Sequence, residues 1–193
     1  MKKSRINYFK LLILLQVYGI IIGGGFIVKP LYHWNRNILL QMKAKSIWIE
    51  WKLSNTASGN LKPEAWLAVP DAGIKTLVIL GDSKENLLKY PCLVENGNLL
   101  QQNSGIKIIS AHRDMHFRNL HKLKKGDKIY IELKEQKKTY EIFMIEIIPK
   151  EEAGDYLRAR RVNDTLVLLT CYPFKYTGPA PERYIIWAES RNN

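Results

Sequence analysis

Apolar and polar positions divide this chain into three regions with different periodicities. Residues 11–28 contain no charged side chain, and residues 30–53 place apolar side chains every three or four positions. From about residue 63 onward, short apolar runs are separated by Gly, Pro, Asp and Asn. These patterns predict, in order, an apolar helix, an amphipathic helix and a body made mostly of β-strands.

The uncharged segment from Leu11 to Val28 has the length of a membrane span. Its eighteen residues, as a helix rising about 1.5 Å per residue, would cover roughly 27 Å, close to the hydrocarbon thickness of a bilayer. We therefore expect a transmembrane anchor over 11–28 after a basic cytoplasmic tail over 1–10. The tail's cations favour an inner-membrane protein whose body is periplasmic. A cleaved signal peptide, processed near Gly23–Gly25, is the alternative.

The residue pattern of 29–62 predicts a stem helix followed by a linker. Tryptophans at Trp34, Trp48 and Trp51 share one helical face with aliphatic residues. That face suits contact with lipid and packing against the folded body equally well. Residues 54–62 are polar and small, which is typical of a linker. The folded domain is thus expected to occupy 63–193.

Within this domain, short β-branched and aromatic runs predict a mostly β fold, with short helices at Ser83–Tyr90 and Glu151–Arg160. Many short strands and few helices favour a closed barrel, because closure removes exposed strand edges. The expected strands are Ala65–Val69, Lys75–Leu80, Lys107–Ala111, Lys128–Leu133, Thr139–Pro149, Thr165–Cys171 and Tyr184–Ala188.

Composition adds little beyond ordinary globular character. The chain is 46% hydrophobic and 25% charged, with a net charge of +12. Four of the positive side chains precede the uncharged segment. The basic runs 122–125 and 158–161 lack interleaved aromatic residues, so they favour exposed faces over a nucleic-acid site. Contact with anionic lipid or an acidic partner stays open.

Candidate chemistry centres on Cys171, which ends an apolar run, while His112 ends another and Arg183 opens the last. A cysteine in that position is often inert packing. Function, however, concentrates where strands end. An adjacent imidazolium or guanidinium lowers the pKa of a thiol and favours the nucleophilic thiolate. His112 can then protonate a leaving amine, and Arg183 can stabilise an oxyanion.

Two other groupings have less specific signals. Cys92 can in principle form a disulfide with Cys171, although a free, partly buried Cys92 is the favoured interpretation. His112 and His116 lie four apart with Asp114 between them, which resembles a metal-ligand spacing. No clear third ligand accompanies them, so we predict neither a metal nor a cofactor.

Three motifs in order resemble the sortases, a family of membrane-anchored cysteine transpeptidases. In chain order they are Ala111–Phe117, then Thr165–Phe174, which contains Thr-Cys-Tyr-Pro, and then Ala180–Tyr184. The resemblance covers about Ala65 to Ala188. The stretch His112–Phe117 is most similar to the class of sortases found in Gram-negative bacteria, with class D next. Any one motif alone would be weak evidence, but three in order are specific.

The resemblance implies an eight-stranded β-barrel in which Cys171 attacks a peptide bond of a C-terminal sorting signal. His112 would serve as acid and then base, Arg183 would stabilise the oxyanion, and an amine would release the product. Substrates would be secreted proteins joined to an acceptor in the cell envelope. Ser110 and the segment 89–92 depart from the family pattern, and no acidic cluster supports calcium dependence.

Two other functions are also compatible with these residues. A hydrolytic cysteine peptidase would use the same Cys171 and His112 but let water resolve the acyl-enzyme. A non-catalytic, membrane-tethered β-domain would use its basic surface to bind lipid or a partner. Transfer and hydrolysis use the same Cys171 and His112, so both stay open here.

Overall fold

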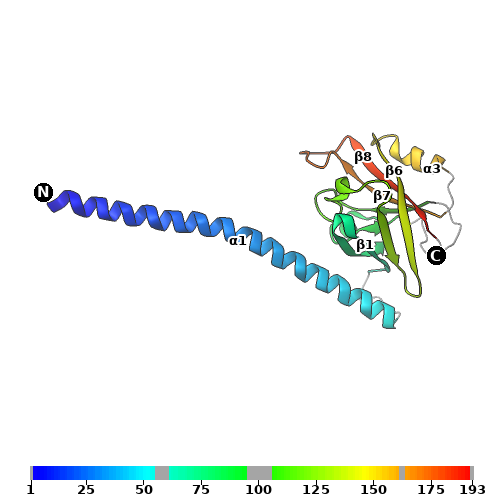
Figure 1. Ribbon diagram of the computed structural model, residues 1–193, viewed down its shortest axis with the longest axis horizontal. Coiled ribbons are helices and arrows are strands. Elements are labelled where there is room, and N and C mark those ends of the chain that lie inside the picture. Colours follow the sequence, from blue (N-terminus) through cyan, green and yellow to red (C-terminus); the bar gives the residue numbers. More distant parts are fainter. Residues whose placement is uncertain (1, 55–60, 95–105, 161–163, 192–193) are drawn as a thin grey trace. The chain divides into compact units, whose positions relative to one another are not determined.

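The computed structural model describes residues 2–54, 61–94, 106–160 and 164–191 of the chain, with side chains of the first helix described for 8–20, 23–24 and 39–54. It divides into two compact units, Met1–Lys43 and Ala44–Asn193. Helix α1 (Lys2–Ser54) runs through this division, so its last turns belong to the same unit as all later elements (Figure 1).

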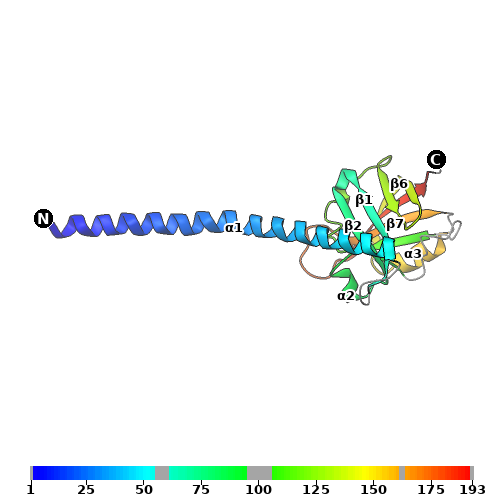
Figure 2. The same ribbon diagram turned by 90° about the horizontal axis from the view of Figure 1, so that it is seen from below.

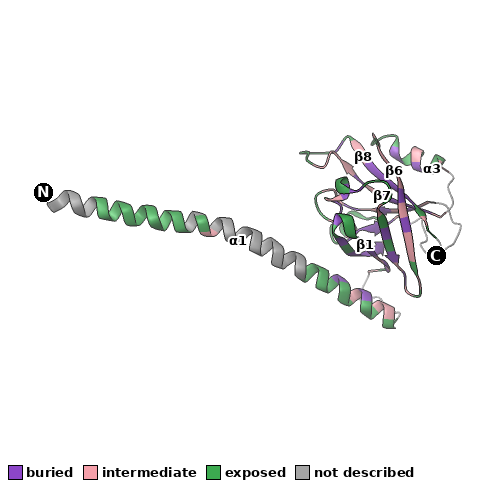
Figure 3. Cartoon of the chain, in the orientation of Figure 1, coloured by how far each residue is buried: buried purple, intermediate pink, exposed green. Residues whose placement is uncertain are grey.

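Helix α1 covers both segments for which the sequence predicts helix. The large apolar side chains described between Tyr8 and Ile20 are 45–73% exposed (Figure 3). Within the described residues, no helix is both long enough and apolar enough to cross a membrane. The predicted anchor at 11–28 falls partly outside that set, because the side chains of 21–22 and 25–28 are not described. The anchor therefore stays a prediction.

The domain is the expected closed β-barrel, with eight strands among the described residues in the order β1-β2-β3-β4-β7-β8-β6-β5. Neighbours pair antiparallel except β2 with β3 and β4 with β7, which are parallel. The strands are β1 (Pro63–Val69), β2 (Ile74–Leu80), β3 (Cys92–Leu93), β4 (Ile106–Ser110), β5 (Lys128–Glu132), β6 (Lys137–Pro149), β7 (Thr165–Tyr172) and β8 (Glu182–Ser190).

Short helices connect the strands, and α2 and α3 lie on the outside of the barrel (Figure 2). They are η1 (Pro70–Ala72), α2 (Lys84–Leu87), η2 (Leu120–Lys122) and α3 (Ala153–Ala159). Helix α2 begins as the sequence predicts, because the Ser83 hydroxyl accepts a hydrogen bond from the Asn86 amide at 3.3 Å. Helix α3 lies within the predicted segment Glu151–Arg160.

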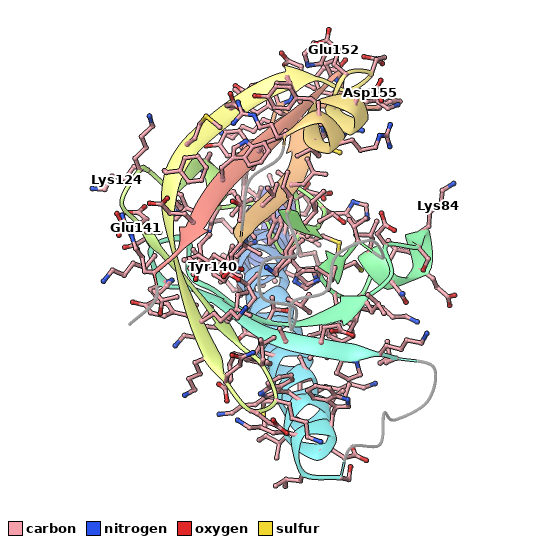
Figure 4. All side chains as sticks on the ribbon, turned by 90° about the vertical axis from the view of Figure 1, so that its right-hand side faces the viewer. Lys84, Lys124, Tyr140, Glu141, Glu152 and Asp155 are labelled. Carbon is pink, nitrogen blue, oxygen red and sulfur yellow. The ribbon has the colours of Figure 1, made fainter. Side chains whose placement is uncertain are left out.

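Alternation along the strands separates an inner face from an outer one. On β7, Leu166 and Leu168 belong to the main core, whereas Val167 packs with Leu157 of α3 in a second cluster. Tyr140 is fully buried and lies inside the ring of strands, while Lys84 and Lys124 point outward (Figure 4). Both faces of this part of the sheet are thus covered, which explains why β7 is apolar along most of its length.

A charged cluster closes the interior at the end where β4 and β7 begin. Lys107 is fully buried, and its Nζ lies 2.5 Å from Oδ1 of Asp164. The Tyr140 hydroxyl donates to the same oxygen at 3.4 Å, and Lys138 Nζ lies 3.9 Å from it. Burial of Lys107 is tolerable because the ammonium has a carboxylate partner. This cluster is at the opposite end of β7 from Cys171.

The last turns of α1 pack against the barrel. Ala44 and Trp48 are buried in a cluster with Leu77 and Ile79 of β2 and Cys92 of β3. Nearby, Lys52 forms an ion pair with Glu132 of β5 at 2.6 Å. For these turns the structure decides between the two predicted roles of the stem, in favour of packing against the domain.

Candidate active site

The three candidate residues lie at the same end of three adjacent strands. Strands β4 and β7 are parallel, so both finish at one edge of the barrel, and β8 runs antiparallel and starts there. Cys171 is the penultimate residue of β7, Arg183 is the second residue of β8, and His112 follows β4 by two residues. Because β7 lies between β4 and β8, the strand ends that carry His112 and Arg183 lie on either side of the strand end that carries Cys171.

Cys171 and Arg183 also share one face of the sheet. They are direct partners in the β7–β8 register, which brings the Cβ atoms of such a pair to about 5 Å. The alternation that sends Leu168 inward and Leu169 outward directs Cys171 to the outer face. The register therefore brings the Cys171 and Arg183 side chains to the same face of two adjacent strands.

The strand alternation assigns His112 to this same outer face. Ile108 packs in the outer cluster, whereas Ile109 and Ala111 belong to the inner core. The Ala111 amide donates to the Leu169 carbonyl at 3.2 Å, so the pairing with β7 continues one residue beyond β4. His112 comes next, level with the end of β7.

A buried side chain locks this arrangement. Thr170 is 3% exposed, and its hydroxyl donates to the Ala111 carbonyl at 2.7 Å. The residue before Cys171 is therefore bonded to the residue before His112. The sequence did not predict this hydrogen bond, although its donor, Thr170, directly precedes Cys171 in the chain.

The two cysteines differ in environment, and both are free thiols. Cys171 is half-buried, whereas Cys92 is fully buried and its thiol hydrogen-bonds the Tyr90 carbonyl at 3.4 Å. Burial first, and then the negative charge of Asp82, raise the pKa of Cys92 to about 12. Cys92 therefore suits packing, and Cys171 is the thiol that a reagent can reach.

The alternative of a disulfide between them is wrong on geometric grounds. Cys92 pairs with Ser110 of β4, which in turn pairs with Leu169 of β7. Two strand spacings of about 4.8 Å each put the Cα atoms of β3 and β7 roughly 9 Å apart or more. That exceeds the separation of about 7 Å that a disulfide can bridge.

The guanidinium of Arg183 is held by two backbone carbonyls that precede it closely in the chain. Its Nη1 donates to the carbonyl of Glu182 at 2.9 Å and to that of Ala180 at 3.3 Å. Among the described residues, Nε and Nη2 have no hydrogen-bond partner, so these donors remain available. A half-buried guanidinium held in this way can receive developing negative charge without reorganising.

The segment that follows His112 is tied to its surroundings on several sides. His116 hydrogen-bonds the Lys89 carbonyl through Nε2 at 3.0 Å. Burial lowers the pKa of His116, and the neighbouring His112 lowers it further, although the bond to Lys89 acts in the opposite direction. Asn119 donates to the Ala72 carbonyl at 3.0 Å. The segment 89–92, which departs from the expected pattern, thus supports the histidine segment.

His116 bonds a backbone carbonyl through its ring nitrogen Nε2. In the part of the chain that the structure describes, no three His, Cys, Asp or Glu side chains converge as a metal site.

Another residue that we did not single out from the sequence is Arg113, which contacts the connection between β7 and β8. The sequence signal that could have identified Arg113 is its position directly after His112.

Comparison with known proteins agrees with this geometry. The family model described as the sortase domain matches residues 67–191. This chain belongs to the sortase family. Sortase D of Bacillus subtilis (strain 168) is 32% identical over 123 residues, which cover 64% of this chain and 61% of that protein. The match thus spans about three fifths of that relative's length.

Solved sortase structures share the fold. Pilus-related sortase C of Group B Streptococcus is 29% identical, with a TM-score of 0.60 over 68% of each chain. Sortase C from Clostridium perfringens SM101 is 26% identical, with a TM-score of 0.58 over 72% of this chain and 74% of that one. The Clostridium perfringens sortase D5 transpeptidase, at 22% identity, has a TM-score of 0.64 and covers 79% of this chain and 99% of its own. At that identity it supports the fold alone.

These comparisons confirm the resemblance to sortases and the eight-stranded barrel. They support the likeness to class D, because a sortase D is among the relatives. The likeness to the Gram-negative class stays a prediction. The roles of Cys171, His112 and Arg183 rest on the geometry and chemistry given above.

Proposed function

We propose that this protein is a sortase-type cysteine transpeptidase that cuts a sorting signal near the C-terminus of a secreted protein and joins the new end to an amine. The observation that carries the proposal is the pairing of Cys171 with Arg183 across β7 and β8, with His112 at the neighbouring strand end. Membership of the sortase family supports it.

The first half of the reaction forms a thioester. The Cys171 thiolate attacks the carbonyl carbon of the scissile peptide bond, and the carbonyl oxygen becomes an oxyanion that Arg183 stabilises. The carbon–nitrogen bond then breaks as the protonated His112 gives its proton to the leaving amine. The thiolate, and not the thiol, is the form of cysteine that attacks a carbonyl carbon.

The second half reverses these roles. An amine attacks the thioester carbonyl carbon, and the neutral His112 takes a proton from the attacking nitrogen. Collapse of the second oxyanion expels the Cys171 thiolate and leaves a new amide bond. One peptide bond has been exchanged for another, so no oxidant, metal or nucleotide is needed. The acceptor would be an amine of the cell envelope.

The outer face around the thiol offers apolar contacts for a bound peptide. Ile108 of β4 and Leu169 of β7 are half-buried and share this face with Cys171. An extended peptide lying along it would bury apolar side chains there while its backbone reaches the thiol. These residues are candidates for contact with the sorting signal.

The decisive test uses the full chain in detergent with a library of quenched fluorescent peptides and triglycine as the amine. We expect a triglycine-linked product and a Cys171 thioester trapped on acid quenching, both absent in Cys171→Ala. Arg183→Lys should lower kcat by about 10²-fold, since one fork of donors is lost. The exposed Arg191→Lys is the matched control and should leave kcat unchanged.

The two rival functions predict different products. If only the free acid forms when triglycine is abundant, water resolves the acyl-enzyme and the protein is a hydrolytic peptidase. If Cys171→Ala folds normally and keeps full activity in a surface-display assay, the domain acts by binding alone. Either result would overturn the transpeptidase proposal.

We also propose that residues 11–28 anchor the protein in the inner membrane, with the barrel in the periplasm. The uncharged sequence and the exposed apolar side chains between Tyr8 and Ile20 support this. The full chain should stay in the membrane fraction after alkaline carbonate extraction, and Leu14→Arg combined with Val17→Arg should release it. Digestion of the barrel by protease in spheroplasts would support the periplasmic side, whereas protection would contradict it.

A further inference from the structure

The connection between β7 and β8, residues 173–181, joins two of the three candidate residues. It leaves β7 just after Cys171 and enters β8 just before Arg183. The Tyr172–Glu182 pair at the base of this connection is the last pair of the ladder and directly follows the Cys171–Arg183 pair. We call residues 173–181 the β7–β8 loop.

The base of the β7–β8 loop is packed, but its tip is not. Phe174 meets Tyr184 in an edge-to-face contact at 5.1 Å between ring centroids, and the Pro181 carbonyl accepts a hydrogen bond from the Lys150 amide at 2.9 Å. In contrast, residues 175–179 are all exposed. The tip consequently has no buried apolar side chain to hold it in place.

One guanidinium holds that exposed tip. Nη2 of Arg113 donates to the Tyr176 carbonyl at 2.9 Å and to the Gly178 carbonyl at 3.2 Å. The guanidinium carbon also lies 5.7 Å from the centroid of the Tyr176 ring, within range of a cation–π contact. Gly178 has a φ of 96°, a left-handed conformation that glycine adopts readily, and it aims this carbonyl at Arg113.

Arg113 directly follows His112 in the chain. The same residue that grips the β7–β8 loop is therefore attached to the third candidate residue. Through Arg113, the strand end that holds His112 is linked to the loop that separates Cys171 from Arg183. The three functional strand ends are joined by side-chain bonds as well as by the sheet.

The second amino group of Arg113 makes no competing contact, because Nη1 is buried and has no hydrogen-bond partner among the described residues. Within the described residues, the two carbonyls of the β7–β8 loop are therefore the hydrogen-bond acceptors of this guanidinium.

We propose that Arg113 is a positioning residue that fixes the β7–β8 loop against the strand end that carries His112 and thereby sets the access of a substrate or reagent to Cys171. Its effect on peptide transfer rests on the proposed function. Its effect on the loop and on the reactivity of the thiol does not.

The test compares Arg113→Ala, Arg113→Lys and Tyr176→Leu in the full chain. Arg118→Ala is the matched control, since Arg118 is an exposed arginine of the same segment. Amide hydrogen exchange of 173–181 and the rate of Cys171 alkylation by iodoacetamide are measured for each, with exchange of 63–80 as the internal reference. A peptide selected from the library, with triglycine, gives kcat and KM.

In Arg113→Ala we expect exchange of 173–181 to rise about tenfold with 63–80 unchanged, because two charge-assisted bonds are lost. The rate of Cys171 alkylation should change together with the exchange of the loop. The value of kcat/KM should fall about tenfold, mainly through a lower kcat. Arg113→Lys should restore part of each effect, and Tyr176→Leu should reproduce a smaller loosening of the loop.

Loop exchange and alkylation in Arg113→Ala equal to those of Arg118→Ala would overturn the proposal. A uniform rise in exchange that includes 63–80 would do so as well, since it would show a general loss of stability. If the wild-type chain transfers no peptide, the proposed transpeptidase function fails, while the loop and alkylation measurements still decide the role of Arg113.

Discussion

The hydroxyl of Thr170 donates a 2.7 Å hydrogen bond to the carbonyl of Ala111, so the residues that precede the candidate nucleophile and the candidate acid are bonded to each other. Their strands are parallel neighbours, and parallel strands finish at the same edge of a sheet. The sheet brings Cys171 and His112 to one end of the barrel, and this bond fixes their relative position there.

Replacing Thr170 by Val should loosen that end of the barrel. The change keeps the branched shape but leaves the buried Ala111 carbonyl without this donor, which costs about 1–2 kcal/mol of unfolding free energy. Urea unfolding measures this loss, and kcat should fall because His112 shifts relative to Cys171. Thr170→Ser retains the hydroxyl and should recover most of the activity; equal kcat in the Val and wild-type chains would refute the positioning role.

The two thiols should differ widely in reactivity. Burial and the neighbouring Asp82 raise the pKa of Cys92 to about 12, so at pH 8 only roughly one molecule in 10⁴ carries that thiolate. Iodoacetamide should therefore label Cys171 alone in the folded chain, and both cysteines in urea. Peptide mass mapping after a timed reaction checks this. Labelling of Cys92 at a rate similar to that of Cys171 would contradict the buried environment.

The longer strands could be predicted because each combines apolar or alternating residues with Gly, Pro, Asp or Asn at its ends. Strand β3 could not, since Cys92 and Leu93 form too short a run to give a pattern. It exists through its pairing with Ile79 and Leu80 of β2 on one side and with β4 on the other. Tertiary pairing, and not local preference, defines this strand.

The candidate site was predictable in its residue types but not in its connections. Cys171, His112 and Arg183 each stand at the end of an apolar run, which local sequence shows. The Cys171–Arg183 register and the reach of Arg113 to Gly178 depend on how separate loops meet in space. The periodicity of the stem likewise predicted a helix, but it did not show that Trp48 contacts the barrel.

Removing the Trp48 side chain should detach the last turns of α1 from the barrel. Trp48 is 5% exposed and packs with Leu77, Ile79 and Cys92, so Trp48→Ala should cost about 3 kcal/mol of unfolding free energy. Leu53→Ala is the control, since Leu53 is 83% exposed and its loss should change stability by less than about 0.5 kcal/mol. Faster alkylation of Cys92 in Trp48→Ala would report the same detachment. Equal stability of the two variants would rule out this packing role.

Asp164 should make the stability of the barrel depend on acid pH. Burial alone would raise its pKa, but the hydrogen bond and charge of Lys107, with the charge of Lys138, outweigh burial and hold the pKa of Asp164 below its ordinary value of 3.8. A carboxyl group with a lowered pKa in the folded state stabilises that state above its unfolded pKa, and the contribution is lost as pH falls below about 4. Asp164→Asn leaves the buried Lys107 without a counter-charge and should cost about 3 kcal/mol at pH 7. The exposed Glu189, which pairs with Arg191 at 3.2 Å, provides the control, because Glu189→Gln should cost less than about 1 kcal/mol. Urea unfolding at pH 7 and pH 3 should show the gap between wild type and Asp164→Asn narrowing at pH 3, and a gap that is constant with pH would contradict the role of this carboxylate.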